Sequence, residues 1–297
     1  MAAPAATPAE AAGTLGILAC GGDLPLCLAR TALAAGRPVF AVAVEGWAEP
    51  ADWAGLPHAV ERVGAAGRIL AALRANGVRQ LVMAGRARRP SVLSLRPDAT
   101  GARILARIGR AFFAGDDGLL RAVARVLEEE GFEILAPQAV LGDLLPGPGL
   151  LTRAAPDARA RADIRRGIAV VNALGMVDVG QGAVVQQGLV LGVEAVEGTD
   201  ALLARCASLK REGPGGVLVK LAKPGQDRRL DLPAVGPTTM AGAAAAGLAG
   251  IAVEAGATIL VHRAATVAAA DAAGLFLLAM DPGAFVAGAE REEEITA

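Results

Sequence analysis

The chain has 297 residues, and its 29 basic and 30 acidic residues leave a formal net charge of −1 and a pI near 6.2. This balance argues against nucleic-acid binding through bulk positive charge, and an aromatic content of 3% disfavours recognition of single strands by base stacking. A hydrophobic content of 54% excludes a disordered chain, because disordered chains are poor in apolar residues.

Cysteine and histidine are scarce. The three cysteines, Cys20, Cys27 and Cys206, form no Cys-x-x-Cys pair, so we expect free thiols in a reducing cytoplasm. The two histidines, His58 and His262, are far apart in sequence, which argues against a zinc site built from His and Cys.

Two segments could be mistaken for a signal peptide or a membrane-spanning helix. Residues 1–12 lack the basic and apolar regions of a signal peptide and are predicted to form a disordered tail. Residues 232–253 carry no charge over a length that could span a bilayer, but they are interrupted by Pro and Gly and consist mostly of small residues. We therefore expect a strand or loop followed by a tightly packed buried helix, in a soluble protein.

The first half of the chain alternates short apolar runs with helical stretches. The apolar runs predict strands at 15–20, 38–44, 80–84 and 132–135. The helical stretches lie at 25–35, 68–76, 103–113 and 118–130. This alternation predicts a parallel sheet with helices on its faces, and residues 13–145 are predicted to form a Rossmann-like N-terminal domain.

The second half begins after a segment rich in Pro and Gly, and we expect a linker at 146–157 and a second α/β domain at 158–297. Strands are predicted at 182–194 (two strands that turn at Gln187-Gly188), 217–221, 251–253, 259–262 and 275–280. Helices are predicted at 163–174, 199–208, 240–248 and 266–273, with Thr199 as an N-cap. The hairpin predicts mixed α/β architecture for this domain.

The first candidate site follows the first predicted strand. Gly21 and Gly22 precede a helix that Leu24 and Pro25 open, and glycines at such a turn let backbone N–H groups approach a phosphate. Glu45, after the second strand, stands where an acidic residue would meet a ribose. The pattern is not Gly-x-Gly-x-x-Gly, so a purely structural turn stays an equal alternative.

Two further loops of the first half carry charge. Gly85 opens a segment with three arginines that ends at Arg89, which either grips phosphates or is a solvated basic loop. Asp116 and Asp117 either hold a hard cation such as Mg²⁺ or cap the next helix, and spacing alone favours the cap.

In the second half, acids and glycines gather at 178–182 and 194–200, and helix capping does not account for the acids that stand in an apolar run. Only three of the 29 basic residues are lysines, and two of them are Lys220 and Lys223. A scarce residue type suggests a specific need, such as a compact charge on a phosphate. Asp231 stands at the start of the uncharged stretch, where a carboxylate needs a cation or a metal.

Six segments together resemble one family. They are GGDLP at 21–25, AG and RP within 84–90, GDDGLLR at 115–121, DVGQGAVV at 178–185, VEAVEGTDALL at 193–203 and VLVKLAKPGQDRRLDLPAVGPTT at 217–239. In this order they resemble the UDP-2,3-diacylglucosamine diphosphatases of lipid A biosynthesis, in the metal-dependent form that is not calcineurin-like. The resemblance extends from about residue 15 to residue 280.

This resemblance implies two α/β domains with the substrate between them, the C-terminal domain being catalytic. It implies hydrolysis of the pyrophosphate of UDP-2,3-diacylglucosamine to UMP and 2,3-diacylglucosamine 1-phosphate (lipid X), with water attacking the phosphorus on the sugar side. The resemblance also implies that the reaction requires Mg²⁺ or Mn²⁺. The essential aspartate of the family lies in a DLPTIG-like motif, which here reads DLPAVG and begins with Asp231.

We therefore expect Asp231, Lys220 and Lys223 to be catalytic, with Asp231 and Asp200 as metal ligands and the lysines neutralising phosphate. The remaining motif residues are expected at the substrate: Gly21, Gly22, Leu24, Pro25, Gly85, Arg89, Asp116, Asp117, Gln181, Gly182, Glu197, Gly198, Thr199, Gln226 and Thr238. The expected partner is the lipid-linked UDP-sugar, with no nucleic acid. Peripheral contact with the cytoplasmic face of the inner membrane and a homodimer are further expectations.

Two other classes of function stay open on the residues alone. One is a nucleotide-binding module without catalysis. The other is an NAD(P)-dependent oxidoreductase, which the Gly-rich first turn suggests, although the missing Gly-x-Gly-x-x-Gly and the lack of an obvious Tyr or His acid weaken it.

Overall fold

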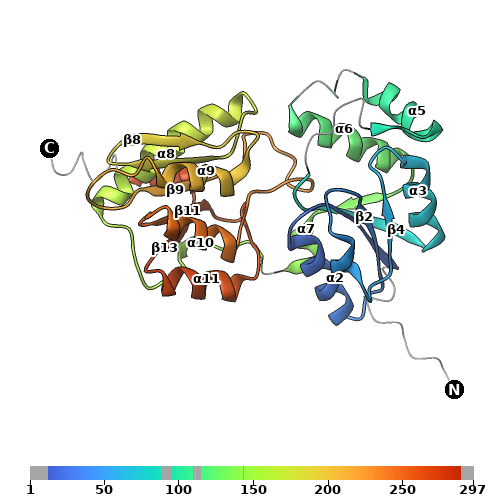
Figure 1. The fold of residues 1–297 in the computed structure, drawn as a ribbon, viewed down its shortest axis with the longest axis horizontal. Coiled ribbons are helices and arrows are strands. Elements are labelled where there is room, and N and C mark those ends of the chain that lie inside the picture. Colours follow the sequence, from blue (N-terminus) through green and yellow to red (C-terminus); the bar gives the residue numbers. More distant parts are fainter. Residues whose placement is uncertain (1–12, 88–94, 110, 112–114, 143, 289–297) are drawn as a thin grey trace. The chain divides into compact units, whose positions relative to one another are not determined.

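A computed structural model describes residues 13–87, 95–109, 111, 115–142 and 144–288, and the predicted tail at 1–12 lies outside these ranges (Figure 1). By its internal contacts the chain divides into two compact units. Unit 1 comprises residues 1–142 with 227–231, and unit 2 comprises 143–226 with 232–297. The short segment 227–231 therefore belongs to the first unit although it is flanked on both sides by the second.

Unit 1 is built on a five-stranded parallel sheet in the order β3-β2-β1-β4-β5. Its strands are β1 (Thr14–Ala19), β2 (Val39–Val44), β3 (His58–Glu61), β4 (Val78–Ala84) and β5 (Glu133–Leu135). Strands β2 and β3 lie on one side of β1 and strands β4 and β5 lie on the other, which is the Rossmann order. This order confirms the fold predicted for the first domain. The predictions did not include β3, because this strand is only partly buried and has no apolar run.

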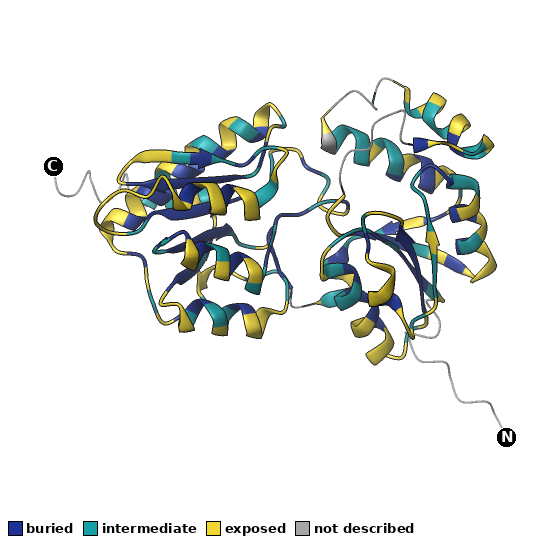
Figure 2. Ribbon diagram, in the orientation of Figure 1, coloured by how far each residue is buried: buried dark blue, intermediate teal, exposed yellow. Residues whose placement is uncertain are grey.

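Helices cover both faces of this sheet. They are α2 (Leu24–Ala34), α3 (Ala66–Ala75), α5 (Ala99–Ile108), α6 (Asp116–Glu129) and α7 (Pro137–Leu141), with a 3-10 turn at Pro50–Trp53. One hydrophobic cluster includes Leu28 of α2 and Trp53, and a second, on the other face, includes Leu73 of α3 and Leu127 of α6. Figure 2 shows β2 dark blue between these layers, and all six of its residues are buried.

Unit 2 is built on a six-stranded sheet in the order β6-β13-β11-β9-β7-β8. Its strands are β6 (Gly149–Leu150), β7 (Gly182–Gln186), β8 (Leu189–Val193), β9 (Val217–Lys220), β11 (Gly250–Glu254) and β13 (Phe276–Met280). The three central strands β9, β11 and β13 are parallel, whereas β6, β7 and β8 are antiparallel to their neighbours. The predicted mixed architecture and the hairpin turning at 187–188 are confirmed, and β6 lies within the segment expected to be a linker.

The helices of unit 2 are α8 (Ala158–Met176), α9 (Gly198–Ala207), α10 (Pro237–Ala245) and α11 (Arg263–Ala272). One core cluster joins α8 to one face of the sheet, and another joins α9, α10 and α11 to the opposite face. The uncharged stretch becomes β10 (Ala234–Val235), which pairs with β12 (Ile259–Leu260), then α10 and β11. Among the described residues, no helix is long and apolar enough to cross a membrane.

Candidate active site

Three polar side chains meet inside unit 2 at the carboxyl end of β9, the end of a parallel strand at which α/β proteins bind ligands. Lys220 is the last residue of β9, and Lys220 and Glu194 are 4% and 6% exposed. The Lys220 ammonium lies 3.3 and 3.5 Å from the two carboxylate oxygens of Glu194 and donates to the Thr199 hydroxyl. That hydroxyl donates in turn to Glu194 Oε1 over 2.7 Å. We call Glu194, Thr199 and Lys220 the buried triad.

Glycines beside the triad allow the backbone to pack against Glu194. Gly182 is in register with Lys220 across the sheet, and its carbonyl accepts from the Glu194 amide over 2.8 Å. A Cβ atom at Gly182 would lie 2.7 Å from Glu194 Oε2, and one at Gly180 would lie 1.9 Å from the Glu194 carbonyl oxygen. Between them, the backbone carbonyl of Gln181 accepts from the Leu221 amide. The side-chain oxygen Oε1 of Gln181 is buried and has no hydrogen-bond partner among the described residues.

The start of α9 differs from the prediction. The helix begins at Gly198 with Glu197 as N-cap, so the assignment of Thr199 as N-cap is wrong. The physical reason is that the Thr199 hydroxyl is engaged by Glu194 and Lys220. The pKa of Glu197 is lowered because its carboxylate accepts a hydrogen bond from the Glu197 backbone amide. The Arg205 guanidinium, 2.8 Å away, lowers this pKa further. Asp200, the predicted metal ligand, is exposed in the first turn of α9.

The loop that follows β9 is held by hydrogen bonds on several sides. The Lys223 ammonium lies 2.5 Å from Asp178 Oδ1, and its backbone amide donates to Gln226 Oε1 over 3.0 Å. The Ala222 amide donates to Glu254, at the end of β11, over 3.1 Å. Asp178 has a φ of 53°, a left-handed conformation that non-glycine residues adopt at some cost. The two lysines, Gln181, Gly182, Thr199 and Gln226 thus come from one region of unit 2.

Asp231 lies in the segment that belongs to unit 1. Leu230, directly before it, is 6% exposed and is part of the core cluster that contains Leu73. Arg229 makes a bidentate pair with Asp227 and also reaches Glu128 of α6 over 2.8 Å. The hydrogen bonds from Arg229 lower the pKa of Asp227. Asp231 is half-buried, and its amide contacts the Asp227 carbonyl over 3.3 Å.

The glycine turn of unit 1 follows β1, as predicted, and leads into α2 through Leu24 and Pro25. Gly21 exchanges backbone hydrogen bonds of 3.1 and 2.6 Å with Arg86. A Cβ atom at Gly85 would lie 2.7 Å from the Gly21 carbonyl oxygen, so this glycine allows the loops after β1 and β4 to pack closely.

Three predicted residues of unit 1 are placed incompletely or differently. Asp117 forms an ion pair of 2.5 Å with Arg121, one turn further along α6, and thus acts as an acid in the first turn of that helix. The side chain of Asp116 and the whole of Arg89 lie outside the described residues. In unit 2, Thr238 is exposed in the first turn of α10.

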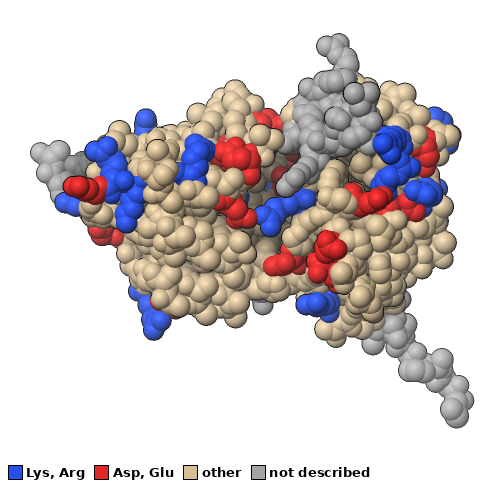
Figure 3. Space-filling view, viewed as in Figure 1, with Lys and Arg blue, Asp and Glu red and all other residues tan. Residues whose placement is uncertain are grey.

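The donor atoms in the described ranges do not form a ready-made cation site. No group of three or more His, Cys, Asp or Glu side chains is placed there so that it could hold a metal ion. The two predicted ligands also belong to different units, Asp231 to unit 1 and Asp200 to unit 2. The face shown in Figure 3 carries both acidic and basic side chains.

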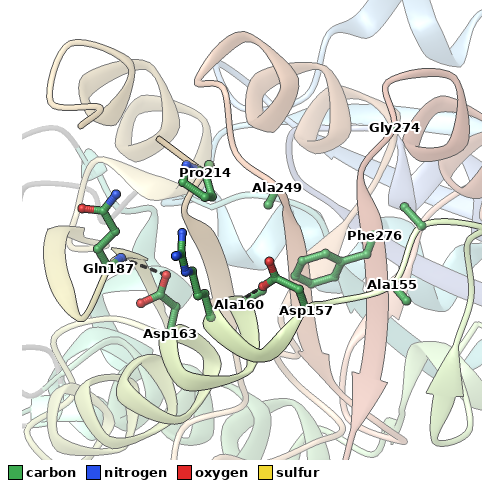
Figure 4. Close-up of a pocket in the computed structure, with 12 residues that line it drawn as sticks. Ala155, Asp157, Ala160, Asp163, Gln187, Pro214, Ala249, Gly274 and Phe276 are labelled. Carbon is green, nitrogen blue, oxygen red and sulfur yellow. Dashed lines mark hydrogen bonds between the residues drawn. The ribbon is translucent and has the colours of Figure 1, made fainter. Parts of the chain in front are cut away.

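A cavity of about 230 Å³ lies at the opposite end of the same sheet, lined by residues at the amino ends of β9, β11 and β13 (Figure 4). Its two carboxylates are engaged in the fold. Asp157 caps α8 by accepting from the Ala160 amide over 2.7 Å, and Asp163 accepts from the amides of Gln187 and Gly188 at the β7–β8 turn. Because ligands bind at the carboxyl ends of parallel strands, we place the candidate site at the other end of the sheet.

The structure also shows site residues that the sequence predictions left out. Glu194 completes the triad, and Asp178 and Glu254 hold the loop after β9. A signal was available for two of them, since Asp178 begins one of the quoted motifs and Glu194 is an acid within an apolar run. Nothing local in the sequence points to Glu254, which reaches the loop only through the pairing of β9 with β11.

Comparisons with known proteins cover most of the chain. Residues 14–144 match the family model "LpxI N-terminal domain", and residues 147–278 match "LpxI C-terminal domain". The curated protein "UDP-2,3-diacylglucosamine pyrophosphatase LpxI" of Caulobacter vibrioides is 44% identical over 274 residues, which cover 90% of this chain and 98% of that protein. Among solved structures, "CobK precorrin-6A reductase" covers 91% of this chain and 87% of its own, at 14% identity and a TM-score of 0.32, too low to support any argument. On the two domain matches and the full-length relative, the chain belongs to the LpxI family.

Proposed function

We propose that this chain hydrolyses the pyrophosphate bond of UDP-2,3-diacylglucosamine, giving UMP and 2,3-diacylglucosamine 1-phosphate. The observation that carries the proposal is the 44% identity, over nearly the full length of both proteins, to a protein named for that activity. The residues of unit 2 suit the chemistry, since hydrolysis of a phosphoric anhydride needs neutralisation of phosphoryl charge and a positioned water. Lysines and carboxylates gather at the end of β9.

Asp231 and Lys223 have the most direct roles in this proposal. Lys223 lies beside Asp178, and its compact ammonium charge is suited to neutralising a phosphate oxygen. Asp231, the first residue of the DLPAVG motif, would orient or deprotonate the attacking water. The glycine turn of unit 1 offers backbone N–H groups at the start of α2, which are suited to a phosphate or a nucleotide.

We also propose that activity requires Mg²⁺ or Mn²⁺, as the family resemblance implies. The described side chains alone provide no group of three or more His, Cys, Asp or Glu that could hold the ion. Magnesium is often held by one or two carboxylates together with substrate phosphates and water, and it supplies charge neutralisation there. Asp231 and Asp200 remain the carboxylates proposed to contact it.

The experiment is release of UMP from UDP-2,3-diacylglucosamine, measured with added Mg²⁺ or Mn²⁺ and again with EDTA. UMP must appear with the metal and vanish with the chelator. Binding of the substrate without UMP release would instead indicate a nucleotide-binding module. Binding of NAD(P) with hydride transfer would indicate an oxidoreductase.

We further propose peripheral contact with the inner membrane on its cytoplasmic face, where a diacylated substrate would reside. Four large apolar side chains at the end of α8 and on two neighbouring loops of unit 2 support this: Met176, Val177, Val179 and Val196, which are 79%, 69%, 46% and 100% exposed. The loops are neighbours because Gly180 packs directly on the Glu194 carbonyl. The expected homodimer stays a prediction, which light scattering of the purified protein would test.

A further inference from the structure

The buried triad is a costly arrangement if its only task is stability. Lys220 and Glu194 are both more than nine-tenths buried, and taking two charges out of water costs several kcal/mol per ion before their attraction is counted. Apolar residues of similar volume often pack at least as stably in such positions. A further role for the pair is therefore worth testing.

The contacts of Lys220 leave little of it for a substrate. Its side chain is 5% exposed, and its ammonium is turned toward both oxygens of Glu194 and toward the Thr199 hydroxyl. A phosphate would have to compete with a carboxylate that is already in place. Lys223, whose partner Asp178 is 27% exposed, is the more accessible of the two lysines.

The triad joins three segments of unit 2. Glu194 follows β8, Thr199 lies in the first turn of α9, and Lys220 ends β9. Their hydrogen bonds fix the connection from β8 to α9 against the strand from which the Lys223 loop departs. The next amides of that loop bond to the neighbouring segments, Leu221 to the Gln181 carbonyl and Ala222 to Glu254.

We infer that Glu194 is a positioning residue for the hydrolysis, which, together with Thr199, holds the Lys220 ammonium and so fixes the loop that carries Lys223. In this role Lys220 acts through its neighbours and does not contact the phosphates. The inference rests on the proposed function and assigns a part in it to Glu194, which was not among the site residues predicted from the sequence.

The test compares UMP release by Glu194→Gln, Lys220→Met and the double variant, with Arg153→Gln as a control at a side chain that is 81% exposed. Each single variant should lower kcat by roughly 10- to 100-fold with KM changed less than about threefold, because small displacements of reacting groups are that costly. The double variant should be no slower than the slower single variant, since both changes break the same cluster. Arg153→Gln should match the unmodified protein.

Two outcomes would overturn the inference while leaving the proposed function intact. One is unchanged kinetics in Glu194→Gln. The other is a KM raised more than about tenfold in Lys220→Met with an unchanged kcat in Glu194→Gln, which would make Lys220 a direct phosphate contact. Failure of the unmodified protein to release UMP would reject the proposed function itself.

A milder pair of variants decides the matter if the charge variants do not fold. Thr199→Val removes the hydroxyl at nearly constant volume, and Thr199→Ser keeps it. Loss of kcat in the valine variant with recovery in the serine variant supports the triad, and equal rates in both contradict it. Circular dichroism and thermal melts establish that each variant is folded.

Discussion

Asp231 has a place in the chain that suits a residue that must be held firmly. It follows buried Leu230 and the Asp227–Arg229 pair, and buried Leu232 comes directly after it. A carboxylate held in this way from both sides loses little conformational freedom when it meets a substrate, which is how an enzyme gains from positioning.

Asp231→Asn should keep the fold and lower kcat by at least about 100-fold, because the amide can neither accept a proton nor supply the negative charge. UMP release under saturating substrate measures it. The matched control is Asp52→Asn, at an exposed aspartate of the same unit, which should leave the rate unchanged. Near-normal hydrolysis by the Asp231 variant would refute the role.

At this scale the sequence predicts residue types better than their partners. The scarcity of lysine pointed to Lys220 and Lys223, and the structure places both at one end of β9. Lys220 and Glu194 are 26 residues apart, and the pairing of β7 with β9 that brings them together is contained in no local pattern.

Single carboxylates also link elements of unit 1. Asp98 caps α5 by accepting from the Gly101 amide over 2.6 Å, and it also accepts from the Gly67 amide of α3 over 2.9 Å. Partial burial raises the pKa of Asp98, but these amide hydrogen bonds outweigh it and hold the pKa below its ordinary value. The ionised form thus stabilises the contact between two helices.

Asp98→Ala should lower the free energy of unfolding by about 1 kcal/mol near neutral pH, the usual value of an N-cap. Because the pKa is lowered in the folded state, this stability is present above the ordinary aspartate pKa and disappears as the pH falls through the lowered value. Urea unfolding should therefore give clearly different free energies of unfolding for the variant and the unmodified protein near pH 7. Below about pH 3 the two free energies should become similar. A difference that persists unchanged in acid would contradict the assignment.

The exposed apolar loops of unit 2 that contain Val179 and Val196 give a further prediction for a single residue. Val196→Asp should weaken co-sedimentation with anionic phospholipid vesicles by roughly 5- to 50-fold, since burying each CH₂ in lipid is worth about 0.8 kcal/mol. Leu209→Asp adds the same charge at another exposed apolar residue of unit 2, 46% exposed, and should have little effect. Equal binding by both variants would remove the support for membrane contact through these loops.

Elements whose signal is local were predictable from the sequence, and the others were not. The β7–β8 hairpin was recognisable from two apolar runs around Gln187-Gly188, and α2 from Pro25 and Gly36. The half-exposed β3 and the two-residue β6 have no apolar run and exist because neighbouring strands pair with them. Thr199 was misassigned because a capping residue and a residue that bonds to a distant strand look alike in sequence.

At the scale of the whole molecule, the chain returns to unit 1 after it has formed β6, β7, β8 and β9 of the unit 2 sheet. Residues 227–231 have their contacts with unit 1, while the residues on either side belong to unit 2. The motif at 217–239 therefore contributes to both units, with Lys220 and Lys223 in one and Asp231 in the other. A boundary inferred from Pro and Gly content cannot show such an insertion, because it depends on where Leu230 is buried.

Leu230→Ala, in the full chain, should therefore destabilise unit 1 although the residue lies far from it in sequence. Truncating a leucine that is 6% exposed in a packed core costs about 2–4 kcal/mol, through lost burial and the cavity left behind. Hydrogen exchange with mass spectrometry should show faster exchange in peptides from β2, α3 and β4, whose residues share that core, and unchanged exchange in β9 and β11. Leu209→Ala, at an exposed leucine of unit 2, is the control and should change neither set. Faster exchange confined to unit 2 would contradict the assignment of 227–231 to unit 1. Because Asp231 follows directly, the same variant should also hydrolyse the substrate more slowly.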